Sequence, residues 1–218
     1  NNNMYVKASG CHLTDLDIDK NYISVNYINI KNKLDDIFFE NKKERELLAK
    51  KIVDNEIVCF FDNKPSIETT MHTLTKKFTI HIHPIQFIVL STFKCRQIIE
   101  DNFKDVCFVD YFTPGIDLAL QIKKIYNNQE TIFLKNHGIV ITTDNIYNLY
   151  NKTELIISKL EQITHLECEK YRYVNIISNS MIEFFNEKFI TYYSEDIVIN
   201  DFLKKENNFG TFFPAKLI

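Results

Sequence analysis

The sequence predicts a protein of the α/β or α+β class, in which a sheet is covered by helices. Two features lead to this prediction. Short runs rich in β-branched and aromatic residues alternate along the chain with longer segments of helical periodicity. Turn-forming residues separate several of these segments, as in Thr113-Pro114-Gly115 and Asn136-His137-Gly138. The 218 residues, of which 45% are hydrophobic, suffice for one large domain with a substantial core.

The predicted strands are identified by their content of β-branched and aromatic residues. They cover residues 4–7, 22–30, 57–61, 78–83, 106–109, 131–134 and 139–142. We expect the strand at 57–61 to be buried or to continue the sheet. The last two strands flank the turn Asn136-His137-Gly138.

The predicted helices lie between and after these strands. They cover residues 41–54, 66–76, 85–93, 116–126, a long segment from about 144, and 174–187. Ser66 is expected to cap the second helix, because its hydroxyl can accept a hydrogen bond from a free backbone N–H. In the long segment, helical spacing predicts one shared face. Its members are Leu149, Thr153, Ile156, Leu160 and Ile163.

Charge and cysteine content restrict the class of function. The net charge is −3 and no long block of like charge occurs, which argues against a general nucleic-acid binder. No apolar run approaches transmembrane length and no signal peptide is recognisable, so we expect no membrane partner. The five cysteines are far apart without a Cys-x-x-Cys pair, a pattern typical of reduced thiols in the cytoplasm.

Two histidine-bearing segments predict a metal centre. His81 and His83 are two residues apart in a predicted strand, so both side chains are expected on the same face. His137 follows another predicted strand, in a tight turn. Three imidazoles are the usual protein share of a catalytic zinc site with one open position. Together with the carboxylate of Glu68, they provide the groups for Lewis-acid chemistry on a carbonyl or hydroxyl oxygen.

Two alternatives remain open for these residues. His72 lies four residues after Glu68, so the two share a helix face, and His72 serves either to orient Glu68 or in packing, with packing slightly favoured. A purely structural zinc site is the other reading of the three histidines. Such sites usually include cysteine, and no cysteine is near these histidines in the sequence.

In this order, the motifs resemble those of the class II aldolase/adducin family. That family carries a Pro-Ser-x-Glu segment at a helix start, a His-x-His strand and a strand ending in Asn-His-Gly. They correspond here to Pro65-Ser66-Ile67-Glu68, His81-Ile82-His83 and Asn136-His137-Gly138. Lys7-Ala8-Ser9-Gly10 and Tyr111-Phe112-Thr113-Pro114-Gly115 are supporting matches. The resemblance covers roughly residues 4 to 170.

The resemblance implies a layered α/β/α fold with a central, mainly antiparallel sheet. It implies a zinc-dependent lyase that cleaves a ketose phosphate by a retro-aldol reaction, with zinc stabilising the enediolate. Zn²⁺ would be bound by His81, His83 and His137. Glu68 would be the catalytic acid/base, and a fourth zinc ligand in the absence of substrate is an alternative role.

The resemblance also implies a substrate site and an assembly. Ser9, Gly10 and Ser66 would bind the phosphate of a small sugar phosphate. The family commonly forms homotetramers, so a homo-oligomer is expected. We expect residues 1–189 to be the family domain, with an N-terminal part outside this sequence, and 190–218 to be a tail or the start of a further segment.

Several functions remain open within this resemblance. The same site would serve a pentulose-phosphate 4-epimerase or a dehydratase. A non-catalytic, adducin-like assembly module need not keep three histidines and the acid, and this chain keeps all four, which favours an enzyme. Ile67 replaces the second serine of the usual Pro-Ser-Ser-Glu and removes one hydroxyl for phosphate. The proton donor to the aldehyde oxygen is unassigned.

Overall fold

The computed structural model describes residues 2–11, 20–37, 41–59, 64–166 and 169–187. The chain divides into two units, Asn1–Thr164 and His165–Ile218. The first unit contains both sheets and the candidate site. In the second unit, the described residues form helix α8 (Glu169–Phe185), which includes most of the helix predicted from residue 174. The predicted domain boundary at 189–190 and the tail at 190–218 lie outside the described residues and stay a prediction.

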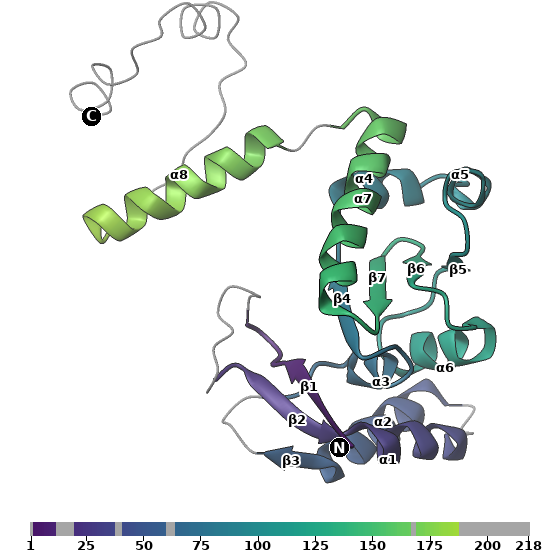
Figure 1. Cartoon of the computed structure of the whole chain (residues 1–218). Coiled ribbons are helices and arrows are strands. Elements are labelled where there is room, and N and C mark those ends of the chain that lie inside the picture. Colours follow the sequence, from purple (N-terminus) through teal and green to yellow (C-terminus); the bar gives the residue numbers. More distant parts are fainter. Residues whose placement is uncertain (1, 12–19, 38–40, 60–63, 167–168, 188–218) are drawn as a thin grey trace, which may run out of the picture. The chain divides into compact units, whose positions relative to one another are not determined.

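The strands of the described residues form two sheets (Figure 1). The three-stranded sheet is antiparallel, in the order β1 (Asn3–Lys7), β2 (Tyr22–Asn26), β3 (Ile57–Cys59). The four-stranded sheet has the order β4 (Phe78–Ile82), β7 (Gly138–Thr143), β6 (Thr131–Leu134), β5 (Cys107–Val109). Among the strand pairs of the described residues, only β5–β6 is parallel. The predicted class, α/β with mainly antiparallel strands covered by helices, is confirmed, with the strands divided between two sheets.

The helices of the first unit follow the predicted order, with two additions. They are α1 (Tyr27–Lys33), α2 (Lys42–Asn55), α3 (Thr69–His72), α4 (Ile85–Ser91), α5 (Arg96–Asn102), α6 (Ile116–Ile125) and α7 (Ile146–Thr164). Helices α1 and α5 were not predicted from the sequence. In α7, Leu149, Ile156 and Leu160 are buried, so the predicted apolar face is the one that packs. Among the described residues, none of the helices combines the length and apolar composition of a membrane span.

The four-stranded sheet buries side chains on both faces, because residues alternate along each strand. In β6, Ile132 and Leu134 join a core cluster with the three-stranded sheet, α2 and α6. Phe133 joins a second cluster with α4, α5 and α7, and α7 runs along the sheet in Figure 1. In β4, Ile80 and Ile82 pack on this second cluster. His81 therefore faces the opposite side, toward α3.

The prediction of one strand over 22–30 is wrong beyond Asn26. The Asn26 side chain accepts a hydrogen bond from the backbone N–H of Asn29 at 3.2 Å and caps α1. A side-chain cap satisfies a backbone donor that a helix start leaves free, so the chain turns into a helix although its residues favour strand.

The prediction of a helix over 66–76 is also wrong. Helix α3 has only four residues, and Ser66 caps the turn before it by accepting a hydrogen bond from the N–H of Glu68 at 3.2 Å. Thr69, Thr73 and Thr75 each donate a hydroxyl hydrogen bond to a carbonyl three residues earlier. These local bonds compete with a regular helix and leave a compact turn between the helix and β4.

The strand predicted at 57–61 is shorter and more exposed than expected. Strand β3 ends at Cys59 and forms the edge of the three-stranded sheet, and Val58 is 55% exposed. Apolar composition alone does not distinguish an edge strand from a buried one. Residues 60 and 61 lie outside the described residues.

Candidate metal centre

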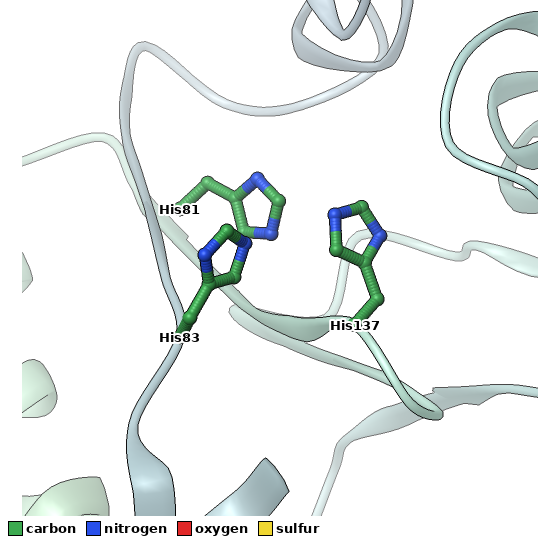
Figure 2. Close-up of side chains that lie close together, drawn as sticks. All are labelled: His81, His83 and His137. Carbon is green, nitrogen blue, oxygen red and sulfur yellow. The ribbon is translucent and has the colours of Figure 1, made fainter.

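The two histidines of the His-x-His motif lie at the end of β4. His81 is paired with Val140 of β7, and His83 follows the last strand residue, Ile82. The ring centroids of His81 and His83 are 4.7 Å apart, as expected for side chains on one face. Figure 2 shows both rings projecting from this stretch toward His137.

His137 reaches the same place from the turn between β6 and β7. The turn is closed by a hydrogen bond from the backbone N–H of His137 to the carbonyl of Leu134 at 3.0 Å, and Asn136 adopts a positive φ of 54°. Asparagine tolerates this left-handed conformation better than most residues. The His137 ring centroid lies 4.8 Å from that of His81 and 5.4 Å from that of His83 (Figure 2). The structure therefore brings the three predicted histidines together.

Gly138 leaves the space that the histidine rings occupy. A Cβ atom at this position would lie 2.5 Å from the His83 ring carbon Cδ2, 2.5 Å from the Ile82 carbonyl oxygen and 3.0 Å from His81 Nε2. The first two distances are shorter than real contacts of a Cβ atom. The glycine directly after His137 thus keeps a pocket for the imidazoles, and its position in the motif is the sequence signal for this role.

We predict that Gly138→Ala both destabilises the fold and disturbs the histidine cluster. The added methyl group collides with a backbone oxygen, which cannot rotate away, so an overpacking loss of about 1–3 kcal/mol is expected. The free energy of unfolding from urea titration and the zinc affinity of the folded variant measure the two effects. Gly10→Ala is the control, since no atom lies within 4 Å of its Cβ position, although its φ of +81° adds local strain. An unchanged zinc affinity in Gly138→Ala would contradict the proposed ring packing.

Glu68 lies between His81 and His137 and bridges them. His81 Nδ1 lies 3.1 Å from one carboxylate oxygen of Glu68, and His137 Nε2 lies 2.9 Å from the other. The side chains of Glu68, His81 and His137 are only 20%, 7% and 11% exposed. Burial raises the pKa of Glu68, but the hydrogen bonds from His137 and His81 outweigh it and hold that pKa well below its usual range. Glu68 is therefore ionised near neutral pH.

The cluster fits a metal ion on the evidence of its own polar atoms. One ring nitrogen of each histidine lies within 4.8 Å of the others, close enough to converge on one ion. His81 Nε2 and His137 Nδ1 are buried and have no hydrogen-bond partner among the described residues. Buried polar atoms without partners are costly unless something binds them. His83 is exposed at the edge of the cluster, which leaves an approach from solvent.

His72 also belongs to this region. It ends α3, and its ring centroid lies 6.4 Å from that of His81. Burial, and then the nearby His81, lower the pKa of His72 from 6.5 to about 4, so the ring is neutral at pH 7. The four-residue spacing from Glu68 was the sequence signal for this placement, although packing was the favoured reading.

We predict that the zinc-free chain loses stability as the pH falls from about 7 to about 5. The folded state binds a proton at His72 only near pH 4, whereas the unfolded chain binds it near pH 6.5, so stability falls through this range. The expected loss is about 2 kcal/mol. Burial lowers the pKa of His83 too, which acts in the same direction. Urea unfolding at both pH values measures the slope; His72→Gln should flatten it, and an equal slope in that variant would contradict the assignment.

The predicted phosphate residues come from two segments that meet. A bridge pairs Ala8 with Pro65, and the N–H of Ser9 donates to the Lys64 carbonyl at 2.9 Å. Gly10 has a φ of +81°, which favours glycine in this turn. Ser66, adjacent to Pro65, is thereby held near the Ser9–Gly10 turn and two residues from Glu68. The structure therefore brings the Ser9–Gly10 turn and the segment of Ser66 together.

Comparison with known proteins identifies the family. The model of the Class II Aldolase and Adducin N-terminal domain matches residues 1–163. The chain belongs to this family. The resemblance inferred from the ordered motifs is therefore confirmed, and this family consists mostly of enzymes.

Two solved structures and one sequence relative illustrate the family membership. The N-terminal class II aldolase domain of a conserved protein from Thermoplasma acidophilum has a TM-score of 0.61 at 20% identity, covering 72% of each chain. YgbL from Klebsiella pneumoniae, a proposed aldolase, epimerase or decarboxylase, has a TM-score of 0.52 at 20% identity, covering 74% of this chain and 72% of YgbL. These two likenesses establish the fold alone.

The sequence relative is an L-fuculose phosphate aldolase from Methanococcus maripaludis. It is 29% identical over 107 residues, which are 49% of this chain and 56% of the relative. The chain thus spans only about half the length of this aldolase. The matched family, the mixed α/β fold and a His/Glu cluster able to hold a metal are the properties on which a function can be proposed.

Proposed function

We propose that this chain is a zinc-dependent lyase that cleaves a ketose phosphate by a retro-aldol reaction. The observation that carries the proposal is the convergence of His81, His83 and His137 with Glu68 in a member of the class II aldolase family. Three imidazoles without cysteine favour a catalytic over a structural zinc site, because structural sites usually close with four ligands that include cysteine. The L-fuculose phosphate aldolase relative supports a sugar phosphate as substrate.

The three histidines would hold the zinc ion, because one ring nitrogen of each lies within 4.8 Å of the others. A bound zinc ion supplies Lewis-acid polarisation of substrate oxygens. Glu68 supports the ligands in this arrangement, because it accepts a hydrogen bond from one nitrogen of His81 and one of His137. Each of those rings then has its proton on the nitrogen that faces Glu68, and its other nitrogen carries a free lone pair.

Glu68 is proposed as the group that moves the proton at the reacting carbon. In the cleavage direction, the hydroxyl-bearing carbon becomes the aldehyde and its O–H proton leaves. The electron pair of the broken C–C bond stays on the carbon next to the carbonyl, which must then gain a proton. In the reverse direction that carbon loses the proton. Glu68 is ionised and keeps unused lone pairs after accepting two hydrogen bonds, so it can take and return this proton.

Ser9, Gly10 and Ser66 are proposed to bind the substrate phosphate. Their two segments are joined by the Ala8–Pro65 bridge, and Ser66 is two residues before Glu68 in the sequence. The Lys7 ammonium group donates to the carbonyls of Ala8 and Cys11 at 3.0 Å and 2.6 Å, which adds positive charge to the Ser9–Gly10 turn. Hydroxyl, backbone N–H and cationic groups together suit a phosphate dianion.

The assembly and compartment complete the proposal. We propose a homo-oligomer, with a tetramer as the expected size, and a location in the cytoplasm. The described cysteines Cys11, Cys59, Cys95 and Cys107 are free thiols, which suits a reducing compartment.

The proposed function is tested by assaying the purified, zinc-loaded chain against a panel of ketose phosphates, beginning with L-fuculose 1-phosphate. Retro-aldol cleavage would release a phosphorylated ketone and an aldehyde, which NMR resolves. Zinc-dependent cleavage of at least one member, lost after chelation, is the expected result. The same spectra reveal a change in configuration without cleavage or the loss of water, which would instead favour the epimerase or dehydratase. No change in any substrate by the loaded chain would contradict an enzymatic role and favour the assembly module.

A further inference from the structure

His72 is a half-buried imidazole that the proposed reaction does not use. It lies one helical turn after Glu68, and its backbone N–H donates to the Glu68 carbonyl at 3.2 Å. One polar side-chain atom from each of Glu68, His72 and His81 lies within 4.8 Å of the other two. The His72 side chain is therefore close to both the Glu68 carboxylate and the His81 ring.

The His72 ring lacks a hydrogen bond in the part of the chain that the structure describes. Its backbone N–H and carbonyl are both bonded, to the Glu68 carbonyl and to the Thr75 hydroxyl, and its ring lies beside the His81 ring, with the two centroids 6.4 Å apart. A polar ring in such surroundings gains most from a nearby acceptor. The Glu68 carboxylate is the acceptor within reach, since an imidazole offers at least one N–H in either protonation state.

The Glu68 carboxylate already accepts hydrogen bonds from two rings of the cluster. His81 Nδ1 and His137 Nε2 face its two oxygens at 3.1 Å and 2.9 Å. The opposite nitrogens of these rings, His81 Nε2 and His137 Nδ1, have no partner among the described residues and would face the metal, so both hydrogen bonds to Glu68 remain when zinc is bound. A carboxylate offers about four acceptor sites, so Glu68 can accept a third hydrogen bond, from His72.

We propose that His72 is a positioning residue that holds the Glu68 carboxylate when the histidine cluster is loaded with zinc. This inference rests on the metal centre of the proposed function, but not on the identity of the reaction. It assigns to His72 an N–H hydrogen bond toward Glu68, and it makes the zinc affinity depend on that N–H. Outer-shell partners of metal ligands typically change metal affinity by about 10–100-fold when they are removed.

The test compares two replacements that differ in one hydrogen-bond donor. His72→Phe keeps a ring of similar shape without an N–H, and His72→Gln keeps a side-chain N–H. The dissociation constant for zinc is measured for each by competition with a chromophoric chelator. We expect His72→Phe to raise the constant by about 10–100-fold and His72→Gln by less than about threefold. His165→Gln, an exposed histidine outside the cluster, is the control and should leave the constant unchanged.

A double-mutant cycle shows whether His72 acts through Glu68. His72→Leu should weaken zinc binding in the wild-type background and have little further effect in a Glu68→Ala background, because the coupling partner is then absent. This cycle also replaces the Phe variant if circular dichroism shows that His72→Phe does not fold. Full additivity of the two substitutions would overturn the proposal.

Other outcomes would also overturn it. Equal losses of zinc affinity in His72→Phe and His72→Gln would indicate that His72 acts by packing and not by a hydrogen bond. Wild-type zinc affinity in His72→Phe would show that His72 has no role in zinc binding. A wild-type chain that takes up no zinc would overturn the inference together with the metal centre. If zinc affinity depends on His72 while no ketose phosphate is cleaved, the inference stands and the proposed reaction fails.

Discussion

Replacing His81 by alanine is expected to remove most of the zinc from the chain. His81 supplies one of three imidazoles, its side chain is 7% exposed, and its Nε2 atom has no hydrogen-bond partner among the described residues. Removing a hydrogen-bond partner of a metal ligand typically lowers metal affinity by about 10–100-fold. Removing one of three ligands should lower the zinc affinity by more than that. Zinc content after gel filtration, determined by elemental analysis, measures the effect.

The matched control for this variant is His165→Ala, which removes an exposed histidine outside the cluster. The control should retain the wild-type zinc content. A His81→Ala protein that folds normally and keeps its zinc would reject His81 as a ligand, and with it the convergence of the three histidines as a metal centre.

Replacing Glu68 by glutamine is expected to separate metal binding from proton transfer. The amide has nearly the same shape and can still accept a hydrogen bond from one histidine ring, so most of the zinc should remain. It cannot act as a base near neutral pH, so proton transfer at the reacting carbon should fall by about 10²–10⁴-fold. NMR measures this as exchange of the hydrogen next to the carbonyl of a bound ketose phosphate with deuterium from the solvent.

Glu154→Gln is the control for this second variant, because Glu154 is an exposed acid on α7. It should exchange at the wild-type rate. Exchange at that same rate in Glu68→Gln would rule out Glu68 as the acid/base, whereas a loss of zinc in Glu68→Gln would show that the carboxylate acts mainly by holding the ligands.

The sequence predicted the arrangement of the histidines because each depends on local geometry. The two-residue spacing of His81 and His83 determines that they share a strand face, whatever the rest of the fold. The Asn136-His137-Gly138 turn joins two antiparallel neighbours, so His137 necessarily lies near the end of β4 once β4 pairs with β7. The alternation of strands with helical segments along the chain likewise predicted a sheet covered by helices.

Other elements were not predictable because tertiary or side-chain interactions override the local preference. Asn26 caps a helix in the middle of residues that favour a strand. At the C-terminal end of α3, the hydroxyls of Thr73 and Thr75 bond to the carbonyls of Thr70 and His72, and the helix has only four residues. His72 thereby lies beside Glu68 and His81. The bridge between Ala8 and Pro65, which joins the two predicted phosphate segments, links residues far apart in the sequence and leaves no periodic signal.

The central claim is that His81, His83 and His137 form a zinc site, and the metal content of the purified chain tests it most directly. The chain is purified without added metal and analysed for zinc per protomer, then titrated with zinc after chelation. About one zinc ion per chain, restored on titration, is the expected result for a three-histidine site with an open position. A chain that contains no metal and takes up none on titration would contradict the claim.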